Sequence, residues 1–168
     1  KPLSQLGLPQ RADNAARKLL ERVRAHNIRE LIVACPGCYY EVRKILAPAG
    51  VRMRTVYEAL AAPPPRAKGG KLYTVHDSCP DRFEGVFGRQ VRDLLEKCGF
   101  SLAEMAHSRK GTICCGSGGM ISHFRPDLSE KMVRLRLEEA QAAGADILVS
   151  YCAGCAMSFA AAEAGAVH

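Results

Sequence analysis

The sequence contains no tryptophan, and aromatic residues make up only 6% of its 168 residues. These few aromatic residues are not interleaved with lysine and arginine, as they are in proteins that stack the bases of single-stranded nucleic acids. No stretch approaches the roughly 18 to 20 apolar residues that a membrane span requires, and no charged and then apolar leader ends in a cleavage site. The sequence therefore argues against nucleic acid as a partner and predicts a soluble, cytoplasmic protein.

Apolar residues account for 48% of the chain, enough for the core of one domain or of two small lobes. The charge is uneven, because residues 1–71 carry 14 Lys and Arg against 5 Asp and Glu, whereas the remainder has a net charge of −2. Charges on the outer faces of predicted helices are typical of a solvated surface. Alternatively, the basic part is a docking surface for an acidic partner subunit or an anionic substrate.

Cysteine, by contrast, is abundant, with eight residues. Most of them cluster in the units Cys35-Pro-Gly-Cys38, Cys114-Cys115 and Cys152-Ala-Gly-Cys155. Such clustering favours metal binding or redox chemistry in a reducing compartment over disulfides. Soft thiolates select zinc, copper(I) or iron-sulfur clusters, and composition alone does not choose among these.

The adjacent cysteines lead into a loop that contains Gly116, Gly118 and Gly119. Three glycines in four residues make a poor helix and a poor strand, so this loop is expected to serve chemistry. Glycine lets the backbone approach a sulfur closely and donate hydrogen bonds to it. The side chains of Cys114 and Cys115 tend to diverge, which suits two neighbouring irons better than one tetrahedral metal.

Hydrophobic periodicity predicts alternating helices and strands. The run at 31–34 lacks alternation, which predicts a strand buried on both faces of a parallel sheet. Because ligands gather beyond the carboxyl ends of parallel strands, Cys35, Cys79 and Cys152 are expected to lie at such an edge. The predicted helices are 11–26, 39–46, 57–62, 87–98, 126–143 and 156–164, and the predicted extended segments are 31–34, 51–56, 71–75, 101–105, 112–113 and 146–150.

The chain contains an internal repeat. Its first copy consists of Arg11-x-Asp13, a helix, a strand and Cys35-x-x-Cys38. Its second copy consists of Arg125-x-Asp127, a helix, a strand and Cys152-x-x-Cys155. The repeat predicts an α/β fold of two related Rossmann-like lobes with short parallel sheets, the first lobe truncated. The expected boundaries are 1–62 for the first repeat, 63–70 for a Pro/Gly linker and 71–168 for a complete second repeat. The first repeat's cysteine pair is expected just before Lys1.

The spacing of five cysteines is specific: Cys79, 34 residues, Cys114-Cys115, 36 residues, then Cys152-x-x-Cys155. This pattern resembles the cysteine-rich CCG domain found in the B subunit of heterodisulfide reductase and in its relatives, which include iron-sulfur subunits of glycolate and lactate oxidation systems. In that family the domain occurs twice, and each full copy can hold an iron-sulfur cluster.

The resemblance implies that these five cysteines ligate a noncubane 4Fe-4S cluster beside Gly116, and that Cys35 and Cys38 contribute to a first cluster. It also implies a fragment of an oxidoreductase subunit that reduces a disulfide or carries out the associated electron transfer. Its expected partners are a flavoprotein or a ferredoxin-like iron-sulfur subunit, with peripheral association to a membrane complex. Turnover by this chain alone is not expected, because two clusters would share the two sulfurs of the substrate.

The sequence is also compatible with other hypotheses about the cysteines. The two Cys-x-x-Cys units could form a zinc site in a non-catalytic binding or assembly module. Cys35 and Cys38 could act as a thioredoxin-like dithiol, and Cys114 and Cys115 could form a vicinal disulfide if no metal binds. The chain could also be the electron-transfer subunit of a 2-hydroxy-acid oxidation complex.

Two residues beside Cys79 are candidates for a role in the site. His76, the candidate catalytic residue, or Asp77 could supply a proton or orient a thiolate. The alternative is that Asp77 or Ser78 caps the following helix. Cys98 is expected to be a buried apolar residue, since it lies at helical spacing from other apolar side chains.

Overall fold

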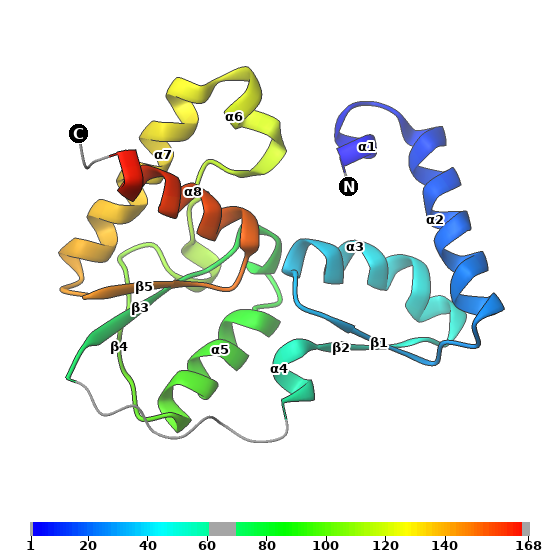
Figure 1. The fold of residues 1–168 in the computed structure, drawn as a ribbon, viewed down its shortest axis with the longest axis horizontal. Helices are drawn as coiled ribbons and strands as arrows, with labels where there is room; N and C mark the ends of the chain where they lie inside the picture. The colour runs from blue at the N-terminus through cyan, green and yellow to red at the C-terminus, as the bar shows by residue number, and fades with distance from the viewer. Residues whose placement is uncertain (1, 61–69, 166–168) are drawn as a thin grey trace.

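The chain forms two α/β lobes, each built around a small parallel sheet (Figure 1). The structure is a computed structural model that describes residues 2–60 and 70–165. It confirms the predicted α/β fold with short parallel sheets, whereas the predicted linker lies outside the described residues except for Gly70. The first lobe contains α1 (Pro2–Gln5), α2 (Pro9–Ala25), β1 (Glu30–Val33), α3 (Pro36–Leu46), β2 (Arg52–Thr55) and α4 (Val56–Ala59). The second contains β3 (Leu72–His76), α5 (Val86–Lys97), β4 (Ser101–Ala103), α6 (Ile121–Phe124), α7 (Pro126–Ala142), β5 (Ile147–Ser150) and α8 (Ala153–Gly165).

The core of the first lobe lies between its two strands and the helices α2 and α3. The strands pair in parallel, with Leu31 opposite Met53, and Leu31 packs with these helices around Val23 and Leu46. Successive side chains of a strand point to opposite faces, and Ile32 points away from this core with 51% of its surface exposed. The prediction that this strand is buried on both faces is therefore wrong.

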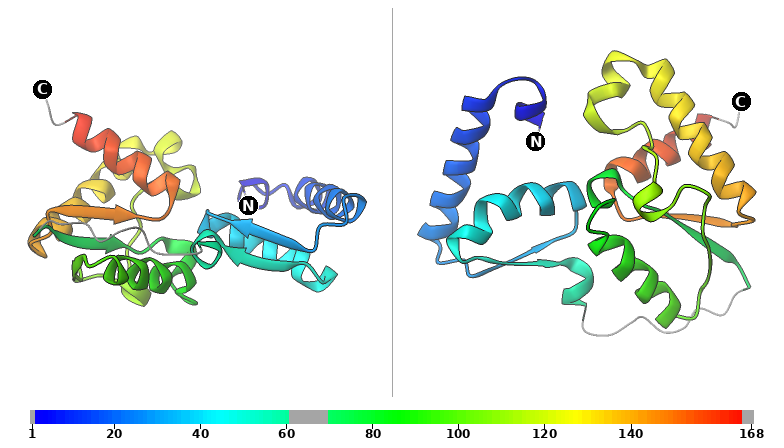
Figure 2. Two further views of the ribbon diagram at one scale, coloured as in Figure 1. Left: turned by 60° about the horizontal axis from the view of Figure 1, so that its bottom comes forward. Right: turned by 180° about the vertical axis from the view of Figure 1, so that it is seen from behind.

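The second lobe has helices on both faces of a three-stranded parallel sheet in the order β4–β3–β5 (Figure 2). On one face, Val75 of β3 packs with Phe87 and Val91 of α5. On the other face, α7 and α8 contribute Val133 and Phe159. The central strand β3 is thus covered on both sides, and it delivers the Cys79 loop from the middle of the lobe.

Most predicted elements of the described residues are confirmed to within a few residues. Gly99 and Gly144, with φ of +84° and +73°, follow the ends of α5 and α7 as left-handed residues. The segment 112–113 is not a strand. The last helix begins at Ala153, so Cys155 lies inside its first turn instead of ahead of it.

The two lobes meet where α3 packs against the amino-terminal end of α5. The ring of Tyr39 lies edge-on to Phe87, with 5.4 Å between the ring centroids. Arg43 of α3 forms an ion pair with Glu84 of the second lobe. This contact brings the amino-terminal end of α3, with Cys35 and Cys38, close to the cysteines of the second lobe.

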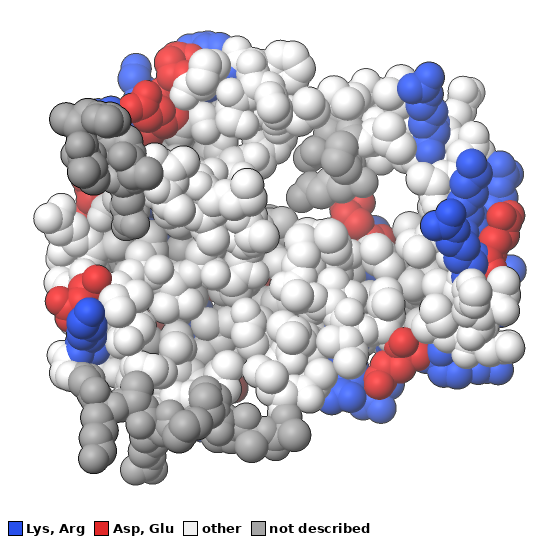
Figure 3. Space-filling model, in the orientation of Figure 1, with Lys and Arg blue, Asp and Glu red and all other residues white. Residues whose placement is uncertain are grey.

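Charged side chains are unevenly distributed over the surface. On the face shown in Figure 3, Lys and Arg gather on the first lobe around α2, whereas the area between the lobes is largely uncharged. Within the described ranges, 2–60 and 70–165, the structure contains no helix with the length and apolar character of a membrane span.

Candidate functional site

Five cysteines meet at the carboxyl-terminal edge of the second sheet. Their side chains interact in sequence, from Cys79 to Cys114, Cys115, Cys155 and finally Cys152. Two of them follow β3 and β5, one lies in the first turn of α8, and the adjacent pair comes from the loop before α6. All are free thiols in the structure, so the vicinal disulfide is not formed. The fold therefore brings together the five cysteines that the spacing singled out.

The pKa values of the five cysteines differ because their thiols are hydrogen-bonded to one another. Hydrogen bonds from the Cys115 and Cys79 thiols and from the Gly116 and Gly118 backbone lower the pKa of Cys114. A hydrogen bond from Cys155, together with backbone N–H groups, lowers the pKa of Cys152 to about 5 despite burial. Donating these bonds raises the pKa values of the three remaining thiols. The hydrogen bonds therefore favour the thiolate forms of Cys114 and Cys152, and the thiolate is the form of cysteine that binds a metal.

The glycine-rich loop is held in place by α7. Gly116 has φ of +82°, and a Cβ atom there would lie 2.5 Å from the backbone oxygen of Ser129. The Ser129 hydroxyl donates to the Gly116 carbonyl at 2.9 Å, and the Gly116 N–H points to Cys114 Sγ at 3.3 Å. Only glycine combines this backbone conformation with this close approach. Gly116 thus fixes the direction in which the two adjacent cysteines present their sulfurs.

Two buried polar atoms beside the sulfurs lack hydrogen-bond partners within the described residues: His76 Nε2 and Ser78 Oγ. A ring nitrogen of His76 lies within 4.8 Å of the sulfurs of Cys115 and Cys155. The Ser78 hydroxyl lies close enough to Cys152 to lower its pKa, although it is not aligned for a regular hydrogen bond. Donors left unpaired in this way fit a sulfur-rich group, since cluster sulfurs accept hydrogen bonds. The donor set therefore fits an iron-sulfur cluster.

The Asp77 carboxylate fixes the loop that carries Cys79. It accepts two hydrogen bonds from Arg92, at 2.7 and 2.8 Å, and one from the Arg109 backbone at 2.6 Å. The Thr112 hydroxyl donates to the Asp77 carbonyl at 2.7 Å. These contacts tie the Cys79 loop to the segment that leads into Cys114.

The helix cap predicted for Asp77 or Ser78 is supplied by Asp81 instead. The Asp81 carboxylate accepts from the backbone N–H groups of Phe87 and Gly88 in the first turn of α5, at 3.2 and 2.7 Å. It also accepts from the hydroxyl of Tyr151 at 3.0 Å. Because of the turn at Cys79–Asp81, α5 begins five residues beyond Asp81. A capping residue normally stands directly before its helix, so the sequence pattern did not identify Asp81 as the cap.

Sequence reasoning missed two further residues that support the site. Tyr151 accepts from the Ser78 backbone at 2.9 Å, and its position directly before Cys152 was a signal that could have identified it. Arg136 contacts His76 from α7 and is fully buried. No sequence signal identified Arg136, because arginine in an amphipathic helix is ordinarily exposed.

The first-lobe cysteines lie at the lobe interface beside the site. Cys35 caps α3, since its sulfur accepts from the Cys38 backbone at 3.3 Å. A Cβ atom at Gly37 would lie 3.8 Å from the Pro80 ring, so the first turn of α3 lies against the Cys79 loop. Cys38 is exposed, and its pKa is raised by its hydrogen bond with Cys35, by burial and by nearby thiolates.

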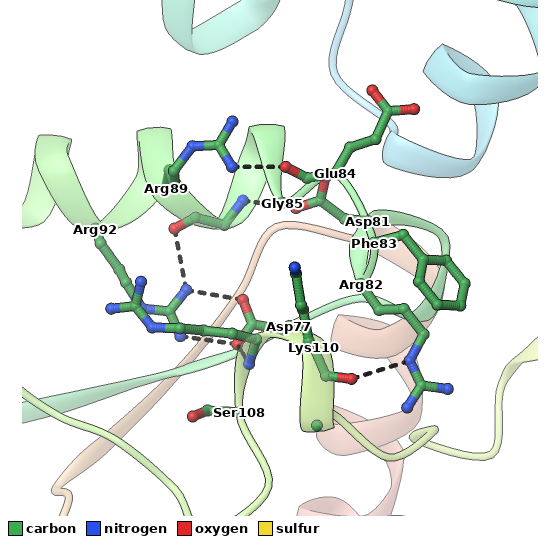
Figure 4. Close-up of a pocket in the computed structure, with 13 residues that line it drawn as sticks. Asp77, Asp81, Arg82, Phe83, Glu84, Gly85, Arg89, Arg92, Ser108 and Lys110 are labelled. Carbon is green, nitrogen blue, oxygen red and sulfur yellow. Dashed lines mark hydrogen bonds and ion pairs between the residues drawn. The ribbon is translucent and has the colours of Figure 1, made fainter.

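A pocket of about 640 Å³ opens on the flank of the same loop, between α5 and the segment around Lys110 (Figure 4). Arg82 donates to the carbonyls of Lys110 and Thr112, and Arg89 donates to the carbonyl of Glu84. Within the residues that the structure describes, neither arginine nor Lys110 has a carboxylate partner. The wall of this pocket therefore carries uncompensated positive charge close to Cys79.

Comparison with known proteins identifies the same region. The family model of the cysteine-rich domain, CCG, matches residues 73–160. The chain is 30% identical over 159 residues to the D subunit of dihydromethanophenazine:CoB–CoM heterodisulfide reductase from Methanosarcina barkeri, and the match covers 85% of this chain and 39% of that protein. The corresponding protein of Methanosarcina mazei is 36% identical over 86 residues, 51% of this chain and 21% of that protein.

Other relatives are named lactate utilization protein A. Lactate utilization protein A of Shouchella clausii is 39% identical over 95 residues, which cover 52% of this chain and 36% of that protein. The chain thus spans about two fifths or less of the length of these relatives. The family match covers the five cysteines that meet at the edge of the second sheet. The chain belongs to the family of CCG cysteine-rich domains.

Proposed function

We propose that the chain is part of a redox subunit that binds an iron-sulfur cluster through Cys79, Cys114, Cys115, Cys152 and Cys155. The observation that carries this proposal is the meeting of these five side chains at one sheet edge, where neighbouring thiols and backbone N–H groups lower the pKa values of Cys114 and Cys152. When bound, the cluster would supply electron transfer and iron that can take up a substrate sulfur. The reaction that we favour is reduction of a disulfide, or electron transfer associated with it.

The surroundings of the cysteines suit such a group. Cys115 and Cys155 are buried among Val133 and Phe159, which would exclude water from that side of the cluster. Cys79 and Cys152 are only partly buried. A substrate would therefore approach from the side of Cys79 and Cys152, where the exposed Cys38 lies.

The names of the relatives support two versions of this function. Relatives named as parts of a CoB–CoM heterodisulfide reductase favour a disulfide as the substrate. The relative named for lactate utilization favours a second candidate, an electron-transfer subunit in 2-hydroxy-acid oxidation. Both versions require other redox subunits as partners, such as a flavoprotein or a ferredoxin-like iron-sulfur subunit.

The test is the content of iron, acid-labile sulfide and zinc in protein prepared without oxygen. We expect about four irons with matching sulfide and a large loss of both in Cys115→Ser. Cys98→Ala is the matched control, because Cys98 is buried in the core away from the five sulfurs. Zinc in place of iron, or equal iron in Cys115→Ser and the control, would contradict the proposal and favour the zinc-binding alternative.

A further inference from the structure

Arg136 is the largest fully buried side chain among the described residues, and its guanidinium is held on several sides. Its Nε–H donates to His76 Nδ1 at 3.3 Å, and its Nη groups donate to the His107 carbonyl and to Met105 Sδ, each at 3.1 Å. Glu139 completes the set with an ion pair. The guanidinium therefore has little freedom to turn away from His76.

This contact determines where His76 carries its proton. A guanidinium has donors and no acceptor, so His76 Nδ1 must accept, and the proton of the neutral ring lies on Nε2. The ring is neutral, because a second proton on Nδ1 would set one donor against the Nε–H donor of Arg136. The edge of the same ring packs against Phe159, with 5.1 Å between the ring centroids. Both its tautomer and its orientation are thus fixed by the surroundings.

The protonated nitrogen has no hydrogen-bond partner within the described residues, although it is buried. With Nδ1 engaged by Arg136, Nε2 is the nitrogen left to face the sulfurs of Cys115 and Cys155. A nitrogen that carries a proton has no lone pair to offer an iron, whereas it can donate a hydrogen bond to sulfur.

We propose that Arg136 holds His76 protonated at Nε2, so that His76 donates a hydrogen bond to sulfur on the Cys115–Cys155 side of the cluster and is not an iron ligand. The inference rests on the proposed function, because it requires a cluster in the site. His76 is then a positioning residue that acts on the reduction potential, since an N–H donor stabilises the more negative, reduced cluster. His76 is fully buried, which suits a hydrogen bond to the cluster better than a role in contacting the substrate.

The first experiment compares two substitutions in the cluster-loaded protein. His76→Phe keeps a ring beside Phe159 but removes the donor, whereas His76→Gln keeps an N–H group. We expect both variants to retain iron and sulfide. We expect the midpoint potential of His76→Phe to move to more negative values, with a smaller change in His76→Gln and none in the control His123→Gln, which alters an exposed histidine.

Iron loss in His76→Phe as large as that in Cys115→Ser would show that His76 is a ligand, and an unchanged potential would show that it donates no such bond. Either result overturns the inference. Circular dichroism of each variant, compared with the parent protein, separates these results from failure to fold.

The second experiment tests the tautomer without a cluster. Long-range ¹H–¹⁵N spectra of the metal-free protein should show His76 with its proton on Nε2, and Arg136→Met, which removes the donor to Nδ1, should disturb this pattern. Arg134→Met is the matched control, since Arg134 is an exposed residue of the same helix. A proton on Nδ1 in the parent protein would overturn the inference. If the parent protein binds no iron, the proposed function fails, but this measurement still decides whether Arg136 fixes His76.

Discussion

The phenolic hydroxyl of Tyr40 in the first lobe donates a hydrogen bond to the buried carboxylate of Asp81 in the second lobe. The same carboxylate caps α5 and accepts from Tyr151, the residue before Cys152. One side chain thus joins the lobe interface, the start of a helix and a cysteine-bearing segment. Burial, together with this contact, raises the pKa of Tyr40, so the hydroxyl keeps its proton at neutral pH.

Tyr40→Phe is expected to destabilise the protein by about 1 to 3 kcal/mol, because it removes one of the hydrogen bonds to a buried, charged carboxylate. Urea unfolding of the parent and the variant measures this difference. Tyr57→Phe is the control, since the Tyr57 hydroxyl makes no hydrogen bond among the described residues, although its ring packs on the same core. An equal loss in both variants would mean that the interface hydrogen bond contributes nothing specific.

Gly116→Ala is expected to lower both stability and iron content. The added methyl group would meet the Ser129 carbonyl at 2.5 Å in a left-handed backbone conformation, which costs on the order of 1 to 3 kcal/mol before the clash is counted. Thermal unfolding and iron analysis measure the two effects. Gly118→Ala is a close control in the same loop, because nothing lies within 4 Å of a Cβ atom there. If both variants retained iron equally, the position of Gly116 would not matter for the site.

The first-lobe cysteines are expected to be dispensable for the cluster of the second lobe. The double variant Cys35→Ser/Cys38→Ser should retain its iron, whereas Cys79→Ser should lose a large part of it, because the Cys79 thiol is hydrogen-bonded to Cys114 within the cluster of five sulfurs. Iron and sulfide analysis of the two proteins under identical loading provides the comparison. Loss of metal in the double variant would instead support a shared four-cysteine site, as in the zinc alternative.

Glu104 is expected to make stability depend on pH. Its partial burial raises the pKa, but hydrogen bonds and charges from Arg92 and Arg109 outweigh this and hold the pKa below the usual 4.5. Because the folded-state pKa is depressed, the stabilisation is present above pH 4.5 and is lost as the pH falls through the folded-state value.

The measurement for Glu104 is the free energy of unfolding of the parent and Glu104→Gln across this range. The variant should be less stable at pH 7, and the difference should shrink in acid. Glu96→Gln, a change at an exposed residue of α5, serves as the control. A difference between parent and Glu104→Gln that stays constant with pH would contradict the role assigned to the Glu104 charge.

Much of the fold followed from local pattern. The periodic segments predicted α2, α3, α5 and α7, and left-handed glycines follow the ends of two of these helices. The face that each strand exposes was harder to predict, as Ile32 shows, because burial depends on which elements lie across the sheet. The cap of α5 was assigned to the wrong residue for the same reason, since a turn separates Asp81 from the helix that it caps.

The set of five cysteines could be predicted from chain order alone, because spacing is a property of the order of residues, and the same holds for the glycine-rich loop after the adjacent pair. The surroundings of those sulfurs became known only from the folded arrangement of helices and strands. Arg136 lies 60 residues from His76 along the chain, and Tyr40 lies 41 residues from Asp81. Such contacts depend on how helices pack on a sheet, and no local pattern of residues encodes them.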